Sequence, residues 1–126
     1  MKKIKFVIIL LFTTILFGCH ETKLLLVPDH LVGIWKTTES RYADRSFEFT
    51  HSAIIFGIGE EEFERYTIDY LKMKRSRDGK STIYTIFYHD QEGEEYILTF
   101  YYYPEKNGVI KVKYQENIVW TKEKNT

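Results

Sequence analysis

Between Leu31 and Lys122, turn signals divide the chain into eight short segments of β-forming residues, and this division constrains the fold more than any other feature. Aromatic and β-branched residues alternate with polar ones inside the segments, a spacing typical of strands with one buried face. Pairs such as Asp78-Gly79 and Asn107-Gly108 mark the turns between them. The predicted strands are 31–38, 46–50, 53–58, 63–75, 82–88, 96–103, 110–114 and 118–122.

Consecutive strands joined by tight turns usually pair with their neighbours, so we expect an antiparallel meander. Eight such strands can close into an up-and-down barrel, which leaves no exposed sheet edge. The predicted fold class is therefore all-β, with a small β-sandwich or a half-open barrel as the alternatives. Within 63–75 the apolar positions change phase after Tyr70, toward Leu71 and Met73, which predicts a bulge or a change of environment.

The amino-terminal segment has the pattern of an export signal. Lys2, Lys3 and Lys5 precede the uncharged residues 6–18. A helix of that length spans about 20 Å, which is short of the roughly 30 Å hydrocarbon core of a bilayer. A secretory signal fits this length better than a transmembrane helix does. We therefore expect residues 1–18 to be a signal peptide.

The only cysteine of the chain follows this segment directly, in Leu16-Phe17-Gly18-Cys19. The pattern resembles a bacterial lipobox, in which the cysteine is acylated and a signal peptidase cleaves before it. Phe17 departs from the pattern, because the residue at that place is usually small, and an ordinary secretory signal or an uncleaved anchor are the alternatives. The resemblance implies a palmitate-bearing lipoprotein of the bacterial cell envelope, attached through Cys19, with the outer membrane favoured. Residues 19–30 would then be a tether, 31–122 the barrel and 123–126 a C-terminal tail. Within the tether, the apolar run Leu24-Leu25-Leu26-Val27 could pack on the barrel, lie near the bilayer surface or form a first edge strand.

Charge narrows the range of partners. Residues 1–18 hold three of the 18 basic residues and no acidic one, so the remainder carries 15 basic and 18 acidic side chains. A net charge of −3 argues against a nucleic-acid partner, which requires a basic surface, and against a polybasic membrane patch. Membrane attachment is therefore expected through the N-terminal lipid, and we expect a monomer.

Gly33-Ile34-Trp35 opens the first predicted barrel strand. This tripeptide resembles the Gly-x-Trp signature on the first strand of the lipocalin-like (calycin) superfamily. The resemblance implies that the tryptophan plugs the closed end of a barrel and that a basic residue of the last strand covers its indole. Lys122 is the candidate for that residue, and Lys113 is the alternative. The long C-terminal helix of true lipocalins has no counterpart in this chain.

The aromatic residues are the sequence feature most relevant to function. An eight-stranded barrel is just wide enough to be filled by side chains or to hold one small ligand. The side chains predicted to point inward should either fill the barrel or contact a ligand held in it. A ligand would be an apolar or amphipathic molecule, and tyrosine hydroxyls would orient it. The ligand-lining candidates are Phe47, Phe49, Tyr66, Tyr70, Phe100 and Tyr102.

Tyr101 and Tyr103 lie on the opposite face of the same predicted strand, where an exposed aromatic stripe could dock another envelope protein. Alternation alone does not say which of the two faces points inward. No arrangement of nucleophile, base and acid predicts an enzyme, and no histidine pair has metal-ligand spacing. The acidic run at Glu60–Glu64 fits a solvated turn better than a calcium loop. We therefore expect no catalytic residues, no metal and no cofactor.

Overall fold

The structure is a computed structural model that describes residues 20–124. These residues form strands and turns, with no α-helix among them. Short 3-10 turns lie at Ser40–Tyr42 and Glu105–Asn107. The predicted signal peptide and Cys19 lie outside the described residues. The strands are β1 (Thr22–Leu24), β2 (Gly33–Thr37), β3 (Ser46–Phe49), β4 (Ala53–Gly59), β5 (Glu62–Arg75), β6 (Thr82–His89), β7 (Glu95–Tyr103), β8 (Val109–Val112) and β9 (Trp120–Lys122).

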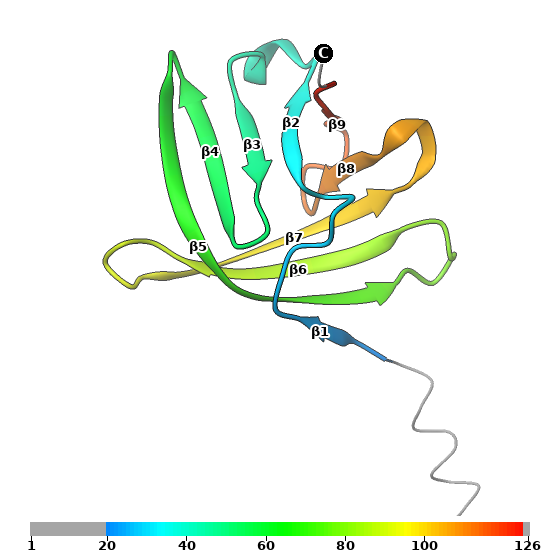
Figure 1. The fold of residues 1–126 in the computed structure, drawn as a ribbon. Helices are drawn as coiled ribbons and strands as arrows, with labels where there is room; N and C mark the ends of the chain where they lie inside the picture. Colours follow the sequence, from blue (N-terminus) through cyan, green and yellow to red (C-terminus); the bar gives the residue numbers. More distant parts are fainter. Residues whose placement is uncertain (1–19, 125–126) are drawn as a thin grey trace, which may run out of the picture.

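Strands β2 to β9 pair in the order of the sequence, and every pairing is antiparallel (Figure 1). The last strand, β9, then pairs with β2, so that Trp35 lies opposite Lys122 and Thr37 opposite Trp120. This pairing closes an eight-stranded barrel. The predicted all-β barrel is confirmed, and the closure excludes the β-sandwich and the half-open barrel.

The long strand β5 pairs with two barrel neighbours in succession. Its first part pairs with β4 and its second part with β6, and Figure 1 shows the curvature that this change of partner requires. The register shifts between Ile68 and Tyr70, which confirms the predicted bulge. The extra residue changes which side chains face inward. Ile68 and Leu71 are both buried, whereas the Tyr70 ring stacks on Phe87 on the outer face. The prediction that Tyr70 lines the interior is therefore wrong, because alternation across a bulge reverses its phase.

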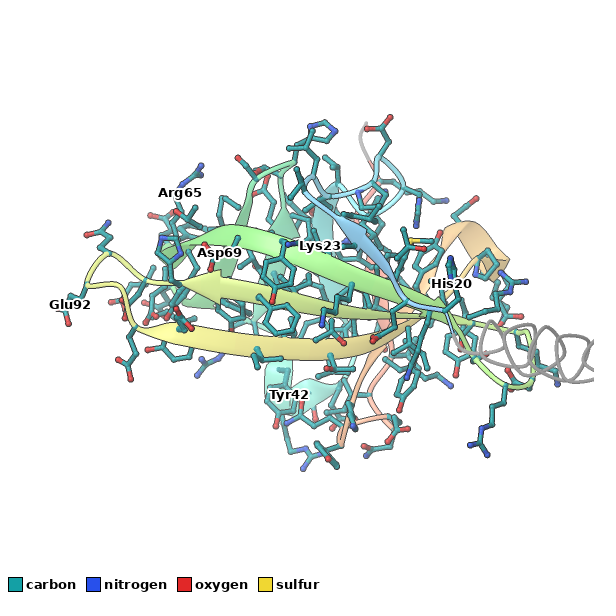
Figure 2. All side chains as sticks on the ribbon, turned by 90° about the horizontal axis from the view of Figure 1, so that it is seen from below. His20, Lys23, Tyr42, Arg65, Asp69 and Glu92 are labelled. Atoms are coloured by element: carbon teal, nitrogen blue, oxygen red, sulfur yellow. The ribbon has the colours of Figure 1, made fainter. Side chains whose placement is uncertain are left out.

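A ninth strand, β1, precedes the barrel. Thr22 pairs with Met73 and Leu24 with Leu71, on the part of β5 that extends beyond β4. Figure 2 shows Lys23 of this strand on the outer surface. The segment predicted as a tether, 19–30, is therefore paired with the barrel through Thr22–Leu24, which begins before the apolar run that could form a first edge strand. The physical reason is that β5 would otherwise expose an unpaired edge.

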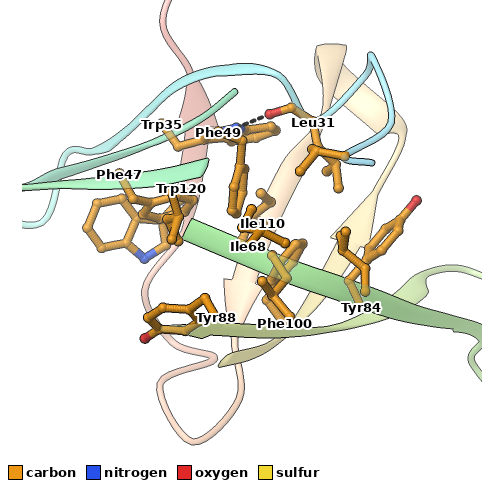
Figure 3. Close-up of a cluster of buried hydrophobic side chains, with 14 of the residues drawn as sticks. Leu31, Trp35, Phe47, Phe49, Ile68, Tyr84, Tyr88, Phe100, Ile110 and Trp120 are labelled. Carbon is orange, nitrogen blue, oxygen red and sulfur yellow. Dashed lines mark hydrogen bonds between the residues drawn. The ribbon is translucent and has the colours of Figure 1, made fainter. Parts of the chain in front are cut away.

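Side chains from all eight barrel strands fill the interior (Figure 3). Trp35, Phe49 and Phe100 have no exposed surface, and the rings of Phe49 and Phe100 stack with centroids 5.6 Å apart. The middle of the barrel is thus a packed core, as its narrow diameter allows. Any small molecule must bind at an end of the barrel or on its outside.

Candidate ligand-binding site at the mouth of the barrel

One end of the barrel, where β2 begins and β9 ends, is sealed by a tryptophan. The Trp35 indole Nε1–H donates to the carbonyl oxygen of Leu31 at 2.9 Å, as Figure 3 shows. Lys122 Nζ lies 5.5 Å from the centroid of the Trp35 ring and donates to the carbonyl oxygen of His30 at 2.7 Å. Gly33 lies against the Lys122 side chain, since a Cβ at position 33 would be 3.0 Å from Lys122 Cδ. We call this the closed end; here the structure brings together Gly33, Trp35 and Lys122.

His30 lies at the closed end. Its Nε2 is 2.9 Å from the Tyr84 hydroxyl oxygen, and its ring centroid is 4.7 Å from that of Tyr102. Burial and, to a smaller extent, the ammonium of Lys122 lower the pKa of His30, while Asp29 acts in the opposite direction. The folded protein therefore binds a proton at His30 less readily than the unfolded chain does.

This lowered pKa predicts a pH dependence of stability. As the pH falls through the ordinary histidine pKa of about 6.5, the unfolded chain takes up a proton before the folded one does. The free energy of unfolding should therefore decrease with acidification through this region and recover above it. His30→Gln, which keeps a polar group near Tyr84, should flatten this dependence. Urea midpoints measured across the pH range test it, and an equal slope in both proteins would contradict the assignment to His30.

The opposite end of the barrel, where β2 and β8 end, holds an apolar pocket of about 410 Å³. We call this end the mouth. Its pocket lies within the volume range of small-molecule sites, which are mostly apolar with a few polar groups. The lining side chains include Tyr42, Phe47, Phe56, Tyr66, Leu98, Val112 and Trp120.

Aromatic contacts hold the walls of the mouth pocket. The ring centroids of Phe47 and Trp120 are 5.0 Å apart, and those of Phe56 and Tyr66 are 5.5 Å apart in an edge-to-face arrangement. The Tyr66 hydroxyl donates to Glu64 Oε2 at 2.6 Å. This hydrogen bond raises the pKa of Tyr66 to about 12, with smaller effects from burial and the Glu64 charge. Tyr66 therefore stays neutral at any physiological pH.

Trp120 contributes an unused polar group to this end of the barrel. Only 7% of the residue is exposed, and its indole Nε1–H is buried without a hydrogen-bond partner among residues 20–124. Figure 3 shows the indole nitrogen on the edge that faces Tyr88, inside the barrel. A buried donor without a partner costs about 1–3 kcal/mol.

Acidic turns surround the mouth. The β4–β5 turn contains Glu60 and Glu61, with Glu61 at a φ of +56°. The β6–β7 turn contributes Asp90 and Glu92 to a surface pocket that also includes Glu64. Arg65 lines the same surface pocket, and Arg45 lines the mouth pocket, where it is paired with Asp44. The carboxylates outnumber these two cations, so the entrance disfavours anionic ligands.

The structure separates the six ligand-lining candidates into groups. Phe47 and Tyr66 line the mouth pocket, whereas Phe49 and Phe100 are buried in the core. Tyr102 faces inward at the closed end, edge-on to Trp35, and Tyr70 lies on the outer face against Phe87. Trp120, Phe56 and Leu98 also line the pocket, and sequence reasoning did not select them. Alternation from Phe100 indicates Leu98, but nothing in the apolar run 53–58 shows which side Phe56 faces.

The partner-face candidates Tyr101 and Tyr103 lie on the outer face of β7. Tyr101 pairs with Ile83 of β6 and with Lys111 of β8, while the inward-facing Phe100 is buried. The ammonium of Lys111 lies 5.1 Å from the Tyr103 ring centroid. Both tyrosines are half-buried by such neighbours.

Comparisons of the chain with protein-family models, with curated proteins and with solved structures find no match. Within residues 20–124, no three His, Cys, Asp or Glu side chains are grouped so that they could hold a metal ion. The described part of the chain also contains no helix with the length and apolar character needed to span a bilayer.

Proposed function

We propose that this protein is a lipid-anchored envelope binding protein whose lipocalin-like barrel holds a small neutral amphipathic molecule in the mouth pocket. The observation that carries the proposal is the asymmetry of the barrel. One end is sealed by Trp35 and Lys122, and the other holds an apolar, aromatic-lined pocket of about 410 Å³. A pocket of this kind above a packed core is suited to binding a small molecule.

The core limits how far a ligand can enter. Below the pocket, Phe49, Ile54 and Phe100 are completely buried and leave no path to the closed end. A ligand would therefore lie against Phe47, Leu98 and Trp120 near the opening, with its other end toward solvent. This geometry favours a short apolar chain or a ring system over a long fatty acid enclosed along its length.

Charged residues at the mouth bear on the head of the ligand. The acidic turns around the mouth disfavour a carboxylate or a phosphate there. Arg45 also lines the pocket, but its guanidinium is paired with Asp44 at 3.6 Å. A charged group would in addition lose its hydration in a mostly apolar pocket, so these features favour an uncharged amphiphile.

The lipobox resemblance supports the cellular location. Acylation of Cys19 would place the lipid one residue before His20, where the described structure begins. Since β1 begins at Thr22 and is hydrogen-bonded to β5, the anchor would hold the barrel close to the membrane of the bacterial envelope.

A fluorescence assay on residues 20–126 tests binding. The apolar fluorophore N-phenyl-1-naphthylamine should become brighter in the mouth pocket and be displaced by decanol, less well by decane, and least by decanoate. Leu98→Trp fills the pocket and should weaken binding of the fluorophore at least about tenfold. Ile97→Trp is the matched control, because Ile97 is the neighbouring residue and is 64% exposed on the outside.

Two results would contradict the proposal. The first is the absence of any fluorescence increase with the unmodified protein. The second is equal weakening by the substitutions at positions 97 and 98, which would place the fluorophore outside the pocket. Preferential displacement by decanoate would leave the pocket in place and overturn the neutral headgroup.

A further inference from the structure

The outer face of β1, β5, β6 and β7 combines lysines with aromatic and aliphatic side chains. We call it the lysine–aromatic face and define it by Lys23, Tyr70, Lys72, Phe87, Ile97 and Tyr101. The Tyr70 and Phe87 rings stack with centroids 4.5 Å apart and planes inclined by 16°. Ile97, the cross-strand partner of Phe87, is 64% exposed. Figure 2 shows this side of the molecule with β1 lying across it.

Two lysines stand directly opposite each other on this face. Lys23 of β1 and Lys72 of β5 are cross-strand partners, and like charges in that position are destabilising. Their ammonium groups lie over the aromatic pair, Lys23 Nζ 4.5 Å from the Tyr70 centroid and Lys72 Nζ 5.6 Å from that of Phe87. Neither forms an ion pair with another described residue. An external anion would relieve the repulsion between them.

Basic residues continue from this face to the β5–β6 hairpin. Lys74 lies on β5 two residues after Lys72, and Arg75, Arg77 and Lys80 follow around the turn, where Asp78 is the single acidic residue. The acidic turns, in contrast, lie at the mouth. The basic residues thus gather toward the β5–β6 hairpin, whereas Asp69 and Glu95 lie at the other end of the face, near Ile97, and Asp69 is paired with His89. The net charge of −3 therefore averages over a basic region at the hairpin and an acidic one toward the mouth. The expectation that the protein has no basic membrane patch followed from this average, which does not describe either region.

The chain itself enters the structure beside this face. Residues 1–19 lead into His20, and β1 begins two residues later. Immediately after β1, Leu25 and Leu26 are 71% and 62% exposed. The inference below rests on the proposed lipid anchor: a lipid at Cys19 would bring Lys23, the two leucines and the lysine–aromatic face close to the membrane.

We infer that the lysine–aromatic face rests on the surface of an anionic lipid bilayer. Lysines with apolar stems, next to aromatic rings, are suited to the headgroup layer, where the ammonium groups meet phosphates and the rings enter the boundary with the acyl chains. The partner that fits this face is a lipid surface. Such a surface offers anionic headgroups directly beside an apolar layer, and the proposed lipid anchor lies close to this face. The acidic mouth would then be directed away from the headgroups by charge repulsion.

Photo-crosslinking of the full-length chain tests this orientation. The protein is purified from bacterial membranes and reconstituted into vesicles of phosphatidylcholine, alone or mixed with phosphatidylglycerol. Benzoyl-phenylalanine replaces Ile97 in one variant. In the control it replaces Glu48, which lies on β3, on the opposite side of the barrel. Position 97 should crosslink to lipid several-fold more strongly in the anionic vesicles than in neutral ones, and position 48 should give little product in either.

The charge of Lys23 provides the second measurement. Lys23→Glu should lower lipid crosslinking from position 97 by about fivefold or more. It should not lower the melting temperature, because the new carboxylate faces Lys72 and replaces a repulsive pair by an attractive one. Lys36→Glu on β2, on the other side of the barrel, is the control for the charge change and should leave crosslinking unchanged, although it removes the ion pair of Lys36 with Glu123.

Three results would overturn the inference. One is equal crosslinking from positions 97 and 48, and another is crosslinking from position 97 that does not depend on the anionic lipid. The third is crosslinking from position 97 to a protein instead of lipid in intact bacterial envelopes, which would identify the face as a protein-docking surface. The neutral-ligand assay at the mouth is unaffected by any of these outcomes.

Discussion

Trp35→Ala is expected to cost about 3–5 kcal/mol of unfolding free energy, the range for removing a buried tryptophan or phenylalanine from a core. The side chain has no exposed surface and lies within 6.4 Å of both the Phe47 and the Tyr102 ring centroids. Its removal also leaves the carbonyl oxygen of Leu31 without the indole donor and Lys122 without the ring beneath its ammonium. Urea unfolding followed by circular dichroism measures the change.

A matched aromatic truncation on the surface controls for the general effect of losing a ring. Tyr114 is 86% exposed, and Tyr114→Ala should change stability by no more than about 0.5 kcal/mol. If Trp35→Ala were as stable as Tyr114→Ala, the buried Trp35 side chain would not contribute to stability as its complete burial predicts.

The second large effect is expected at Gly33. Its φ of +136° lies in a region that residues with a Cβ rarely adopt, and the added carbon would be 3.0 Å from Lys122 Cδ. Strain of this kind costs on the order of 1–3 kcal/mol, so Gly33→Ala should lower the free energy of unfolding by that amount. Thermal and urea unfolding both report it.

Gly79 is the matched control for Gly33. It also has a positive φ, +72°, but no atom lies within 4 Å of a Cβ built there. Gly79→Ala therefore carries conformational strain without the contact to Lys122 and should be the milder substitution. Combining Gly33→Ala with Lys122→Ala removes the contact, so the two costs should not add. Simple additivity would show that the close approach to Lys122 has no energetic role.

Much of the barrel could be predicted from the sequence because strands and turns leave local signals. Alternation located most of the barrel strands, and an uninterrupted apolar run located 53–58. The phase change after Tyr70 indicated the bulge now seen between Ile68 and Tyr70. The same bulge made the prediction for Tyr70 wrong, because alternation gives the face on which a side chain lies only relative to the neighbouring residues. Which of the two faces points into the barrel depends on how the other strands pack.

Features that depend on distant residues were not predictable in the same way. The strand β1 exists because β5 extends past β4 and leaves an edge to be paired, a fact of the tertiary structure. The mouth pocket requires Trp120, Phe56 and Tyr42 from three separate parts of the chain. The separation of charge between the β5–β6 hairpin and the mouth is likewise invisible in a net charge.

The short strand β9 determines where the barrel opens most readily. It is joined to β2 by three residue pairs and to β8 by two, whereas β5 and β6 share eight. Local opening follows the weakest set of backbone hydrogen bonds. Trp120 belongs to β9, so one wall of the mouth pocket lies on the strand that separates from its neighbours at the lowest cost. Lys122 belongs to the same strand and pairs with Trp35. Local opening of β9 would therefore widen the mouth and, at the other end of the barrel, draw the Lys122 ammonium away from the Trp35 ring.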